Sequence, residues 1–217
     1  MSLDLKALIF DLDGVITDTA EYHYRSWKRL ADEEGIPFTR QDNEALRGVS
    51  RRESLRRMLK GRQIAEATAE AWMTRKNTYY VQMLDLITPA DVLEGVTPLL
   101  AEARTRGLKL GLASASRNAW KVLDRLGMSA AFDVVGDGSS VVNTKPSPDL
   151  FIWVAGRLNV SPPQALVFED AEAGIDAGLT GGFWTVAVGS APGDKGHVHI
   201  ATMRAADLTR ILAALPC

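Results

Sequence analysis

Two aspartates, Asp11 and Asp13, follow directly after the apolar run Ala7 to Phe10 near the start of the sequence. A short run without polar residues suits a strand buried in the middle of a parallel sheet. Because side chains alternate along an extended chain, both carboxylates should point the same way beyond the end of this strand, and Gly14 then allows a sharp turn. Ligand crevices in open α/β sheets lie at the carboxyl ends of the strands. The position of the two acids therefore favours a chemical role.

Two simpler explanations of these aspartates are a calcium loop and a surface turn. An EF-hand loop needs an acid or Asn at its first, third and fifth positions and Gly at its sixth, but here Gly14 comes too early and Val15 takes the fifth position. Asp and Gly are also common in ordinary surface turns. The stretch Phe-Asp-Leu-Asp-Gly-Val followed by Thr-Asp-Thr contains more than such a turn requires.

A second polar motif, Ser114-Ala115-Ser116-Arg117-Asn118, lies between a predicted strand and a predicted helix. Small hydroxyl residues and free backbone N–H groups at the start of a helix suit a phosphate group. Ser and Asn are also ordinary helix caps, so this motif alone is weak evidence.

Two further motifs carry charge. Lys145 precedes Pro146 in a predicted loop, where a lone lysine is usually solvated, and Glu169 and Asp170 follow the apolar run Leu166 to Phe168. Acids commonly begin helices, but a pair directly after a buried strand is hard to explain as solubilising. A functional role for Lys145 is inferred from the acids, because an acid cluster without a nearby cation would be electrostatically unfavourable.

Electrostatics predicts a cofactor for the acids at the strand ends. Like charges about 4 Å apart repel by roughly 4 kcal/mol at an effective dielectric constant near 20, so several such pairs cannot stay ionised without cations. Mg²⁺ fits best because it binds oxygen ligands, keeps waters and shares phosphate oxygens, and the sequence has no His or Cys cluster for zinc. The acids placed in this crevice are Asp11, Asp13, Glu169 and Asp170, with Lys145 as a further cation.

The elements that must position these residues alternate between strand and helix. This alternation predicts an α/β fold with a doubly wound parallel sheet, in which every motif lies at the carboxyl end of a strand. The expected strands are 7–10, 108–113, 132–135, 165–168 and 183–188, and the expected helices are 96–106, 120–126 and 150–158.

A helical insertion interrupts this alternation after the first strand. Tyr24, Trp27 and Leu30 recur at helical spacing before Gly35, and residues 63–86 are alanine-rich without an internal Gly or Pro. The predicted domains are a core of residues 1–16 and 88–217 and a helical cap of residues 17–87.

The composition is that of an ordinary globular protein. The 217 residues are 46% apolar and 24% charged, with a net charge of −2, which argues against a general nucleic-acid binder. The single cysteine, Cys217, leaves no intrachain disulfide and is compatible with a reducing compartment. No long apolar run or secretory leader is evident, so we expect a cytoplasmic protein that does not enter a membrane.

Taken together, these motifs resemble the pattern of the haloacid dehalogenase-like (HAD) phosphotransferases over the whole chain. The stretch from Phe10 to His23, which reads FDLDGVITDTAEYH, looks like the β-phosphoglucomutase branch of that superfamily. The resemblance implies that Asp11 attacks phosphorus and forms an aspartyl phosphate, and that Asp13 is the general acid and base. It also implies that Mg²⁺ binds Asp11, the Asp13 carbonyl oxygen and Asp170, with help from Glu169.

The same resemblance assigns substrate binding to the phosphate motif, to Lys145 and to the cap. In the cap, Gly48-Val49-Ser50-Arg51 look like a substrate-specificity loop, Lys76 like a cap lysine, and Thr19 and His23 like a hinge pair. Each has a simpler explanation as a helix cap or a polar helix position, but their joint order and spacing favour the functional one. The substrate-binding set is Thr19, His23, Trp27, Gly48, Val49, Ser50, Arg51, Lys76, Ser114, Ala115, Ser116, Arg117, Asn118 and Lys145.

Two positions depart from the family pattern. Ala171 stands where a Ser often follows the acid pair, and Arg117 stands where a Lys is common beside the phosphate-binding serine. Arg keeps the charge but changes reach and geometry, so the affinity for a second phosphate is left open.

The activity that the resemblance implies is a mutase of this branch, which interconverts β-D-glucose 1-phosphate and glucose 6-phosphate through β-glucose 1,6-bisphosphate. The expected partners are small sugar phosphates, and we expect a monomer. A sugar-phosphate phosphatase on the same scaffold is the nearest alternative. A catalytically idle sugar-phosphate binding protein is a second one, against which the intact set of four motifs argues.

Overall fold

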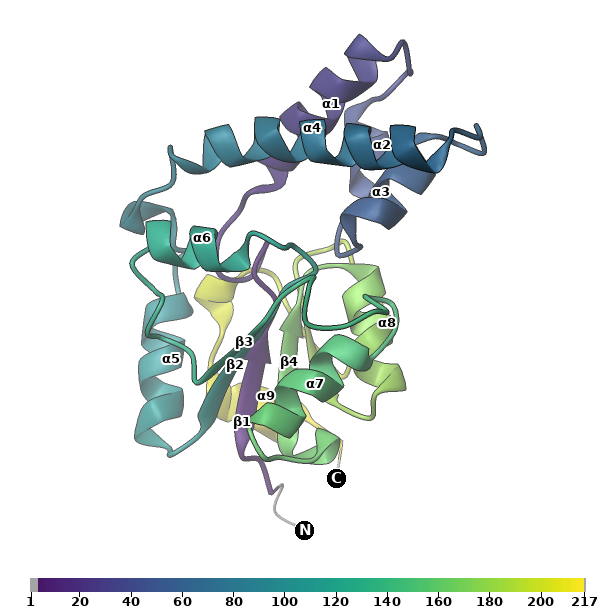
Figure 1. The fold of residues 1–217 in the computed structure, drawn as a ribbon. Coiled ribbons are helices and arrows are strands. Elements are labelled where there is room, and N and C mark those ends of the chain that lie inside the picture. The colour runs from purple at the N-terminus through teal and green to yellow at the C-terminus, as the bar shows by residue number, and fades with distance from the viewer. Residues whose placement is uncertain (1–3, 217) are drawn as a thin grey trace.

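The computed structural model describes residues 4–216, which form a six-stranded parallel sheet with helices on both faces (Figure 1). The strand order is β3-β2-β1-β4-β5-β6, so the chain builds one side of the sheet from β1 to β3 and the other side from β4 to β6. The predicted doubly wound fold is confirmed. The strands are β1 Ala7–Phe10, β2 Lys109–Ala113, β3 Val134–Gly136, β4 Ala165–Glu169, β5 Trp184–Val188 and β6 Val198–Ile200.

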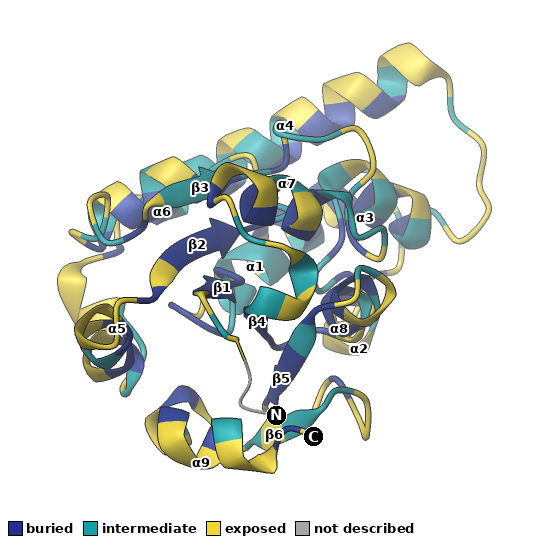
Figure 2. Cartoon of the chain, turned by 90° about the horizontal axis from the view of Figure 1, so that it is seen from below, coloured by how far each residue is buried: buried dark blue, intermediate teal, exposed yellow. Residues whose placement is uncertain are grey.

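Strand β1 lies at the centre of the sheet between β2 and β4 and is buried on both faces. Leu8 and Phe10 pack into the apolar cluster that includes α5, α6 and α9, whereas Ala7 and Ile9 pack on the opposite side against α7. Full burial of a large apolar side chain contributes about 1.5 to 3 kcal/mol, so this short strand is firmly held. Figure 2 shows the buried central strands surrounded by helices with exposed outer surfaces. The helices named here are α5 Val96–Thr105, α6 Ala119–Arg125, α7 Asp149–Arg157 and α9 Leu208–Ala214.

Four helices follow β1 and lie beyond the carboxyl ends of the strands (Figure 1). The first, third and fourth of them share an apolar cluster, which includes Trp27, Leu30, Leu55 and Trp72, and the flanks of the second helix add Phe38 and Leu46. The end of the fourth helix, around Tyr80, packs instead into the core beside the sheet, so the boundaries of the predicted cap stay a prediction. The four helices, called the cap below, are α1 Ala20–Glu33, α2 Arg40–Glu44, α3 Arg51–Met58 and α4 Glu66–Leu84.

The sequence patterns did not predict several short elements. Helix α2 has five residues and depends on a local cap, in which the Thr39 hydroxyl accepts from the Asp42 N–H while the Asp42 carboxylate accepts from the Thr39 N–H. Helix α3 likewise begins after Ser50, which caps the N–H of Glu53. The other unpredicted elements are β6, α8 Glu172–Thr180, α9, and the 3₁₀ turns Pro89–Asp91, Pro162–Gln164 and Met203–Ala205.

Cys217 and residues 1–3, which belong to the predicted core domain, lie outside the described residues. Within residues 4–216, no helix combines the length and the apolar character that crossing a bilayer requires.

Candidate active site

A cavity of about 560 Å³ lies between the cap and the carboxyl ends of the strands. Most of the predicted site residues line it, although they come from distant parts of the sequence. Thr19, Lys145 and Glu169 are buried behind the lining. Thr19 contacts Asp13, Lys145 contacts Asp11, and a Glu169 oxygen lies within 4.8 Å of oxygens of Asp11 and Asp170. The predicted residues in the lining are Asp11, Asp13, His23, Trp27, Gly48, Val49, Ser50, Arg51, Lys76, Ser114, Ala115, Ser116, Arg117, Asn118 and Asp170.

Three buried carboxylates meet at the floor of the cavity. Oxygens of Asp11, Glu169 and Asp170 lie within 4.8 Å of one another, because β1 and β4 are neighbours and end at the same edge of the sheet. Lys145 Nζ lies 2.5 Å from Asp11 Oδ1 and 2.8 Å from Glu169 Oε2, and it also donates to the Ala113 carbonyl at 2.9 Å. Burial alone would lower the pKa of Lys145, but Asp11 and Glu169 raise it above its usual value. The lysine is therefore charged and neutralises part of the cluster.

The carboxylate cluster suits a hard divalent cation. Burial is the main reason that the pKa values of Glu169 and Asp170 are raised, and the charge of Asp11 raises both further, while Lys145 and, at Asp170, Arg47 act in the opposite direction. Oxygen ligands in a compact group are what Mg²⁺ prefers. The turn after β1 is shaped to the same cluster, because Gly14 has a φ of +78° and a Cβ there would lie 1.9 Å from Asp170 Oδ2. Glycine is required at this position both for the turn and for the approach of the carboxylate.

The raised carboxyl pKa values predict a pH-dependent response to Mg²⁺. The folded metal-free protein binds protons that the unfolded chain releases above about pH 4, so its unfolding free energy falls as pH rises. Mg²⁺ requires ionised carboxylates, so its stabilisation grows over the same range. We expect excess Mg²⁺ to raise the Tm by about 3 to 10 °C at about pH 8 and hardly at all at about pH 5. Differential scanning calorimetry with Asp170→Asn as the control, which should lose the gain, measures this; an equal gain at both pH values contradicts it.

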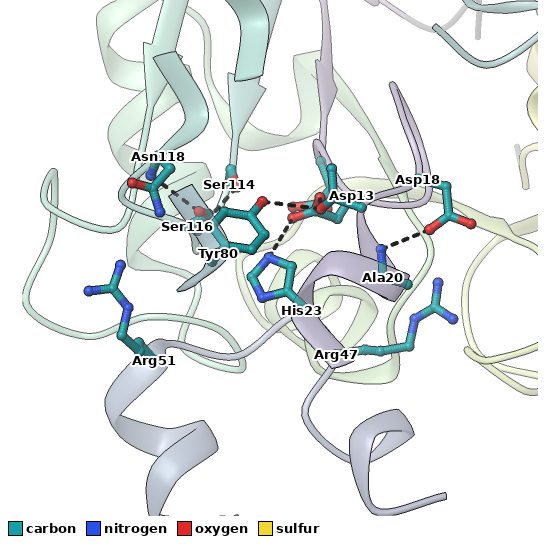
Figure 3. Close-up of polar contacts among 12 residues, drawn as sticks. Asp13, Asp18, Ala20, His23, Arg47, Arg51, Tyr80, Ser114, Ser116 and Asn118 are labelled. Carbon is teal, nitrogen blue, oxygen red and sulfur yellow. Dashed lines mark hydrogen bonds and ion pairs between the residues drawn. The ribbon is translucent and has the colours of Figure 1, made fainter. Parts of the chain in front are cut away.

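Asp13 occupies a different environment from Asp11. Burial, followed by the charge of Asp11, raises the pKa of Asp13 to about 7. The Thr19 hydroxyl donates to its Oδ1. His23 Nε2 lies 3.9 Å from its Oδ2, and Figure 3 shows the His23 ring facing Asp13. A carboxyl group with a pKa near neutrality can both give and accept a proton at the edge of the cavity. The sequence analysis missed Tyr80, whose hydroxyl lies 3.2 Å from Thr19 Oγ1.

Two cap residues form a polar pair near Asp13. Lys76 Nζ lies 3.1 Å from His23 Nδ1, and it also faces the rings of Trp27 at 5.0 Å and Tyr80 at 4.7 Å. Burial is the main reason that the pKa of Lys76 and the pKa of His23 both fall well below their usual values. The simpler explanation of Lys76 as a solvated helix residue is wrong, since it is only 2% exposed.

The motif after β2 presents polar groups to the cavity. Ser114 Oγ accepts the Ser116 N–H, and Ser116 Oγ accepts the Asn118 N–H, both at 3.2 Å. Asn118 stands at the N-cap position of α6, yet its side chain makes no capping hydrogen bond. The helix-cap explanation therefore does not account for the Asn118 side chain, which donates a hydrogen bond to Asn77.

The loop before α3 brings the cap into contact with the acid cluster. Arg47, which the sequence analysis did not identify, forms an ion pair with Asp170, and this contact spans 123 residues of sequence. Next to it, Gly48 has a φ of +72°, and a Cβ there would lie 2.8 Å from the Cβ of Ala171. The small side chain of Ala171, one of the two departures noted above, lies where this loop meets the core.

The fold and the site define an α/β protein with a helical insertion, whose buried carboxylates lie where the strand order reverses direction. A sequence model of the haloacid dehalogenase-like hydrolases matches residues 5–182. The chain belongs to this family.

Similar proteins include both mutases and phosphatases. The chain is 44% identical over 189 residues to a β-phosphoglucomutase of Bacillus subtilis, covering 85% of this chain and 84% of that protein. It is 31% identical over 180 residues to a phosphorylated carbohydrates phosphatase of Thermotoga maritima, covering 82% of each. The crystal structure of a β-phosphoglucomutase from Clostridium difficile superposes with a TM-score of 0.93 at 40% identity, covering 97% of this chain and 96% of that one.

Proposed function

We propose that this chain is a β-phosphoglucomutase, which interconverts β-D-glucose 1-phosphate and glucose 6-phosphate through β-glucose 1,6-bisphosphate. The observation that carries the proposal is a pair of arginines that line the cavity. Arg51 comes from the cap and Arg117 comes from the core. Among residues 4–216, neither forms an ion pair with a carboxylate. A mutase needs such a second anion site for the phosphate that is not being transferred, whereas a phosphatase does not.

The electrostatics of the arginine pair support an anion site. Burial, followed by the positive charge of Arg117, lowers the pKa of Arg51. Arg51 is also the first residue of α3, where the helix dipole disfavours a cation. Two guanidinium groups that repel each other gain most from a dianion placed between them, and guanidinium binds phosphate bidentately.

The reaction that fits this site is phosphoryl transfer through Asp11. A phosphoryl group held on the Asp11 carboxylate passes to a hydroxyl of the sugar phosphate while Asp13 accepts the hydroxyl proton. The resulting bisphosphate reorients, its other phosphoryl group returns to Asp11, and Asp13 returns the proton to the departing oxygen. Lys145 keeps the Asp11 carboxylate in place, and Ser114 and Ala115 offer polar groups to the transferring phosphate.

The cofactor proposed for this site is Mg²⁺, held by Asp11, the Asp13 carbonyl oxygen and Asp170, with Glu169 assisting. When bound, it neutralises charge on the transferring phosphoryl group. We further propose that residues 17–87 act as a cap domain that covers the cavity and excludes water. The partners are small sugar phosphates, and the protein acts as a monomer in the cytoplasm.

A sugar-phosphate phosphatase is the second candidate, because the relative from Thermotoga maritima is named a phosphorylated carbohydrates phosphatase and a phosphatase would use the same Asp11 and Asp13. Phosphorus NMR separates the two. The protein is incubated with β-glucose 1-phosphate, Mg²⁺ and a trace of β-glucose 1,6-bisphosphate. We expect the glucose 6-phosphate signal to grow while inorganic phosphate stays low; phosphate release at the rate of substrate loss contradicts the mutase.

Replacing Arg51 with Ala tests the second phosphate site. A hydrogen bond that involves a charged group contributes roughly 1.5 to 3 kcal/mol, so Arg51→Ala should lower the mutase kcat/KM by about 10 to 150-fold. Small acyl phosphates carry no second phosphate and should still phosphorylate Asp11 at nearly the wild-type rate. Coupled mutase assays and quenched-flow phosphorylation measure the two reactions.

The matched control for this test is Arg56→Ala. Arg56 lies on the same helix but is exposed and pairs with Glu53, so its removal should change neither rate. If Arg51→Ala slows both reactions equally, Arg51 is a structural residue of the cap and the mutase proposal loses its main support.

A further inference from the structure

The side chain of Asn77 connects the cap to the core at one edge of the cavity. Its Oδ1 accepts a hydrogen bond from Arg51 Nη2 at 2.7 Å and another from Asn118 Nδ2 at 2.9 Å. The three residues come from separate segments, since Arg51 begins α3, Asn77 lies in α4, and Asn118 precedes α6. Figure 3 shows Arg51 and Asn118 on the same side of the site. One carboxamide oxygen therefore bridges two residues that line the cavity from opposite domains.

The donors and acceptors of this bridge can be assigned without ambiguity. A guanidinium group can only donate, so Asn77 must present its oxygen to Arg51. The same oxygen faces Asn118, which must then present its NH₂ group. The guanidinium has five N–H groups and the carboxamide NH₂ has two, so one bond to Asn77 leaves both residues with donors for a ligand. The bridge can persist while a phosphate is bound.

A purely local role for Asn77 does not explain these contacts. Asn is a weaker helix former than the residues that usually fill the middle of a long helix. The next residue, Thr78, satisfies its hydroxyl within the helix, on the Thr74 carbonyl at 3.2 Å. Asn77 instead makes its two contacts with residues 26 and 41 positions away in sequence. Its side chain thus connects tertiary elements and does not stabilise its own helix.

We propose that Asn77 is a positioning residue for the phosphate that is not being transferred, a role that rests on the proposed function. It acts through Arg51 and Asn118, which it holds at a fixed separation across the boundary between cap and core. A long arginine side chain loses conformational freedom when it binds a ligand, and fixing it beforehand removes part of that loss. Asn77 does not touch the reacting phosphoryl group, so the first phosphorylation of Asp11 does not depend on it.

The test measures binding separately from turnover. The Kd for β-glucose 1,6-bisphosphate is determined by titration calorimetry without Mg²⁺, on the wild type, Asn77→Ala, Arg51→Ala and the double variant. We expect Asn77→Ala to weaken binding by about 3 to 10-fold. Because Asn77 acts through Arg51, the double variant should be weaker than Arg51→Ala by less than this factor. Single effects that multiply fully in the double variant would overturn the proposal.

Three further measurements separate positioning from a structural defect. With Mg²⁺ present, acetyl phosphate should phosphorylate Asn77→Ala at the wild-type rate, and a matching loss of that rate would overturn the proposal. The neighbouring variant Thr78→Ala should bind the bisphosphate as the wild type does. Asn77→Asp keeps the size of the side chain but adds a negative charge that competes for Arg51, so it should bind the bisphosphate no better than Asn77→Ala; wild-type affinity in this variant contradicts the role.

The outcome for Asn77 is distinguishable from that of the proposed function. A wild type that binds the bisphosphate without isomerising β-glucose 1-phosphate contradicts the mutase activity alone, and the comparison of Asn77 variants still decides the positioning role. A wild type that does not bind the bisphosphate contradicts the anion site and the positioning role together.

Discussion

Asp11→Asn should abolish both mutase and phosphatase activity, with a loss of about 10⁴-fold or more. The substitution removes the attacking anion, because a carboxamide cannot form the aspartyl phosphate, and it removes one of the three clustered carboxylates that could hold the proposed metal ion. Incubation with an acyl phosphate and Mg²⁺, followed by acid quenching, should yield no phosphoprotein. Normal turnover, or an undiminished acid-stable phosphoprotein in this variant, rejects Asp11 as the nucleophile.

Loss of folding is not expected to explain the result for Asp11→Asn. Asn has nearly the same size as Asp, and the buried Lys145 keeps its ion pair with Glu169 at 2.8 Å. Removing one of several mutually repelling carboxylates should leave the metal-free Tm unchanged or raise it. Thermal unfolding without Mg²⁺ checks this point, and a marked fall in Tm would make the loss of activity uninformative about the nucleophile.

The sequence predicted the sheet well because its central strands carry strong local signals. The predicted strands 7–10 and 165–168 are uninterrupted apolar runs followed by acidic residues, and β1 has the predicted bounds. Strand β3 begins later than predicted, because among the residues of this segment Val134–Gly136 pair with β2. Phe132 is buried, but it lies before the strand. The strand β6 was missed because its middle residue, His199, is exposed and no buried pattern marks it.

The chemistry of the site was more predictable than its supporting contacts. Asp11 and Glu169 were placed together because parallel strands end at one edge, a rule that needs no coordinates. Arg47 gave no comparable signal, since an arginine in a polar helical segment is usually solvated. Its contact with Asp170 depends on how the cap lies over the sheet, which follows from tertiary packing. The same reason explains why Tyr80 was not identified.

Asp13→Asn should lower mutase turnover by about 10² to 10⁴-fold, the range typical of general acid and base catalysis. The variant keeps the backbone carbonyl proposed for the metal and can still accept the Thr19 hydroxyl, but it cannot accept or return a proton. The pKa of Asp13 lies near 7, so wild-type transfer from the phosphoenzyme to a sugar hydroxyl should slow below that pH, where the carboxyl group is protonated. Stopped-flow rates for this half-reaction should lose that dependence in Asp13→Asn.

The comparison of substrates separates Asp13 from Asp11. The leaving group of an acyl phosphate is a carboxylate that needs little protonation, so Asp13→Asn should still form the phosphoenzyme at a rate within a few-fold of wild type, whereas Asp11→Asn should form none. Asp18→Asn is the matched control, because Asp18 is an exposed acid whose side chain accepts from the Ala20 N–H, which Asn does equally well. If Asp13→Asn loses sugar-phosphate binding as well as turnover, the residue is structural, and an unchanged mutase rate excludes it as the acid and base.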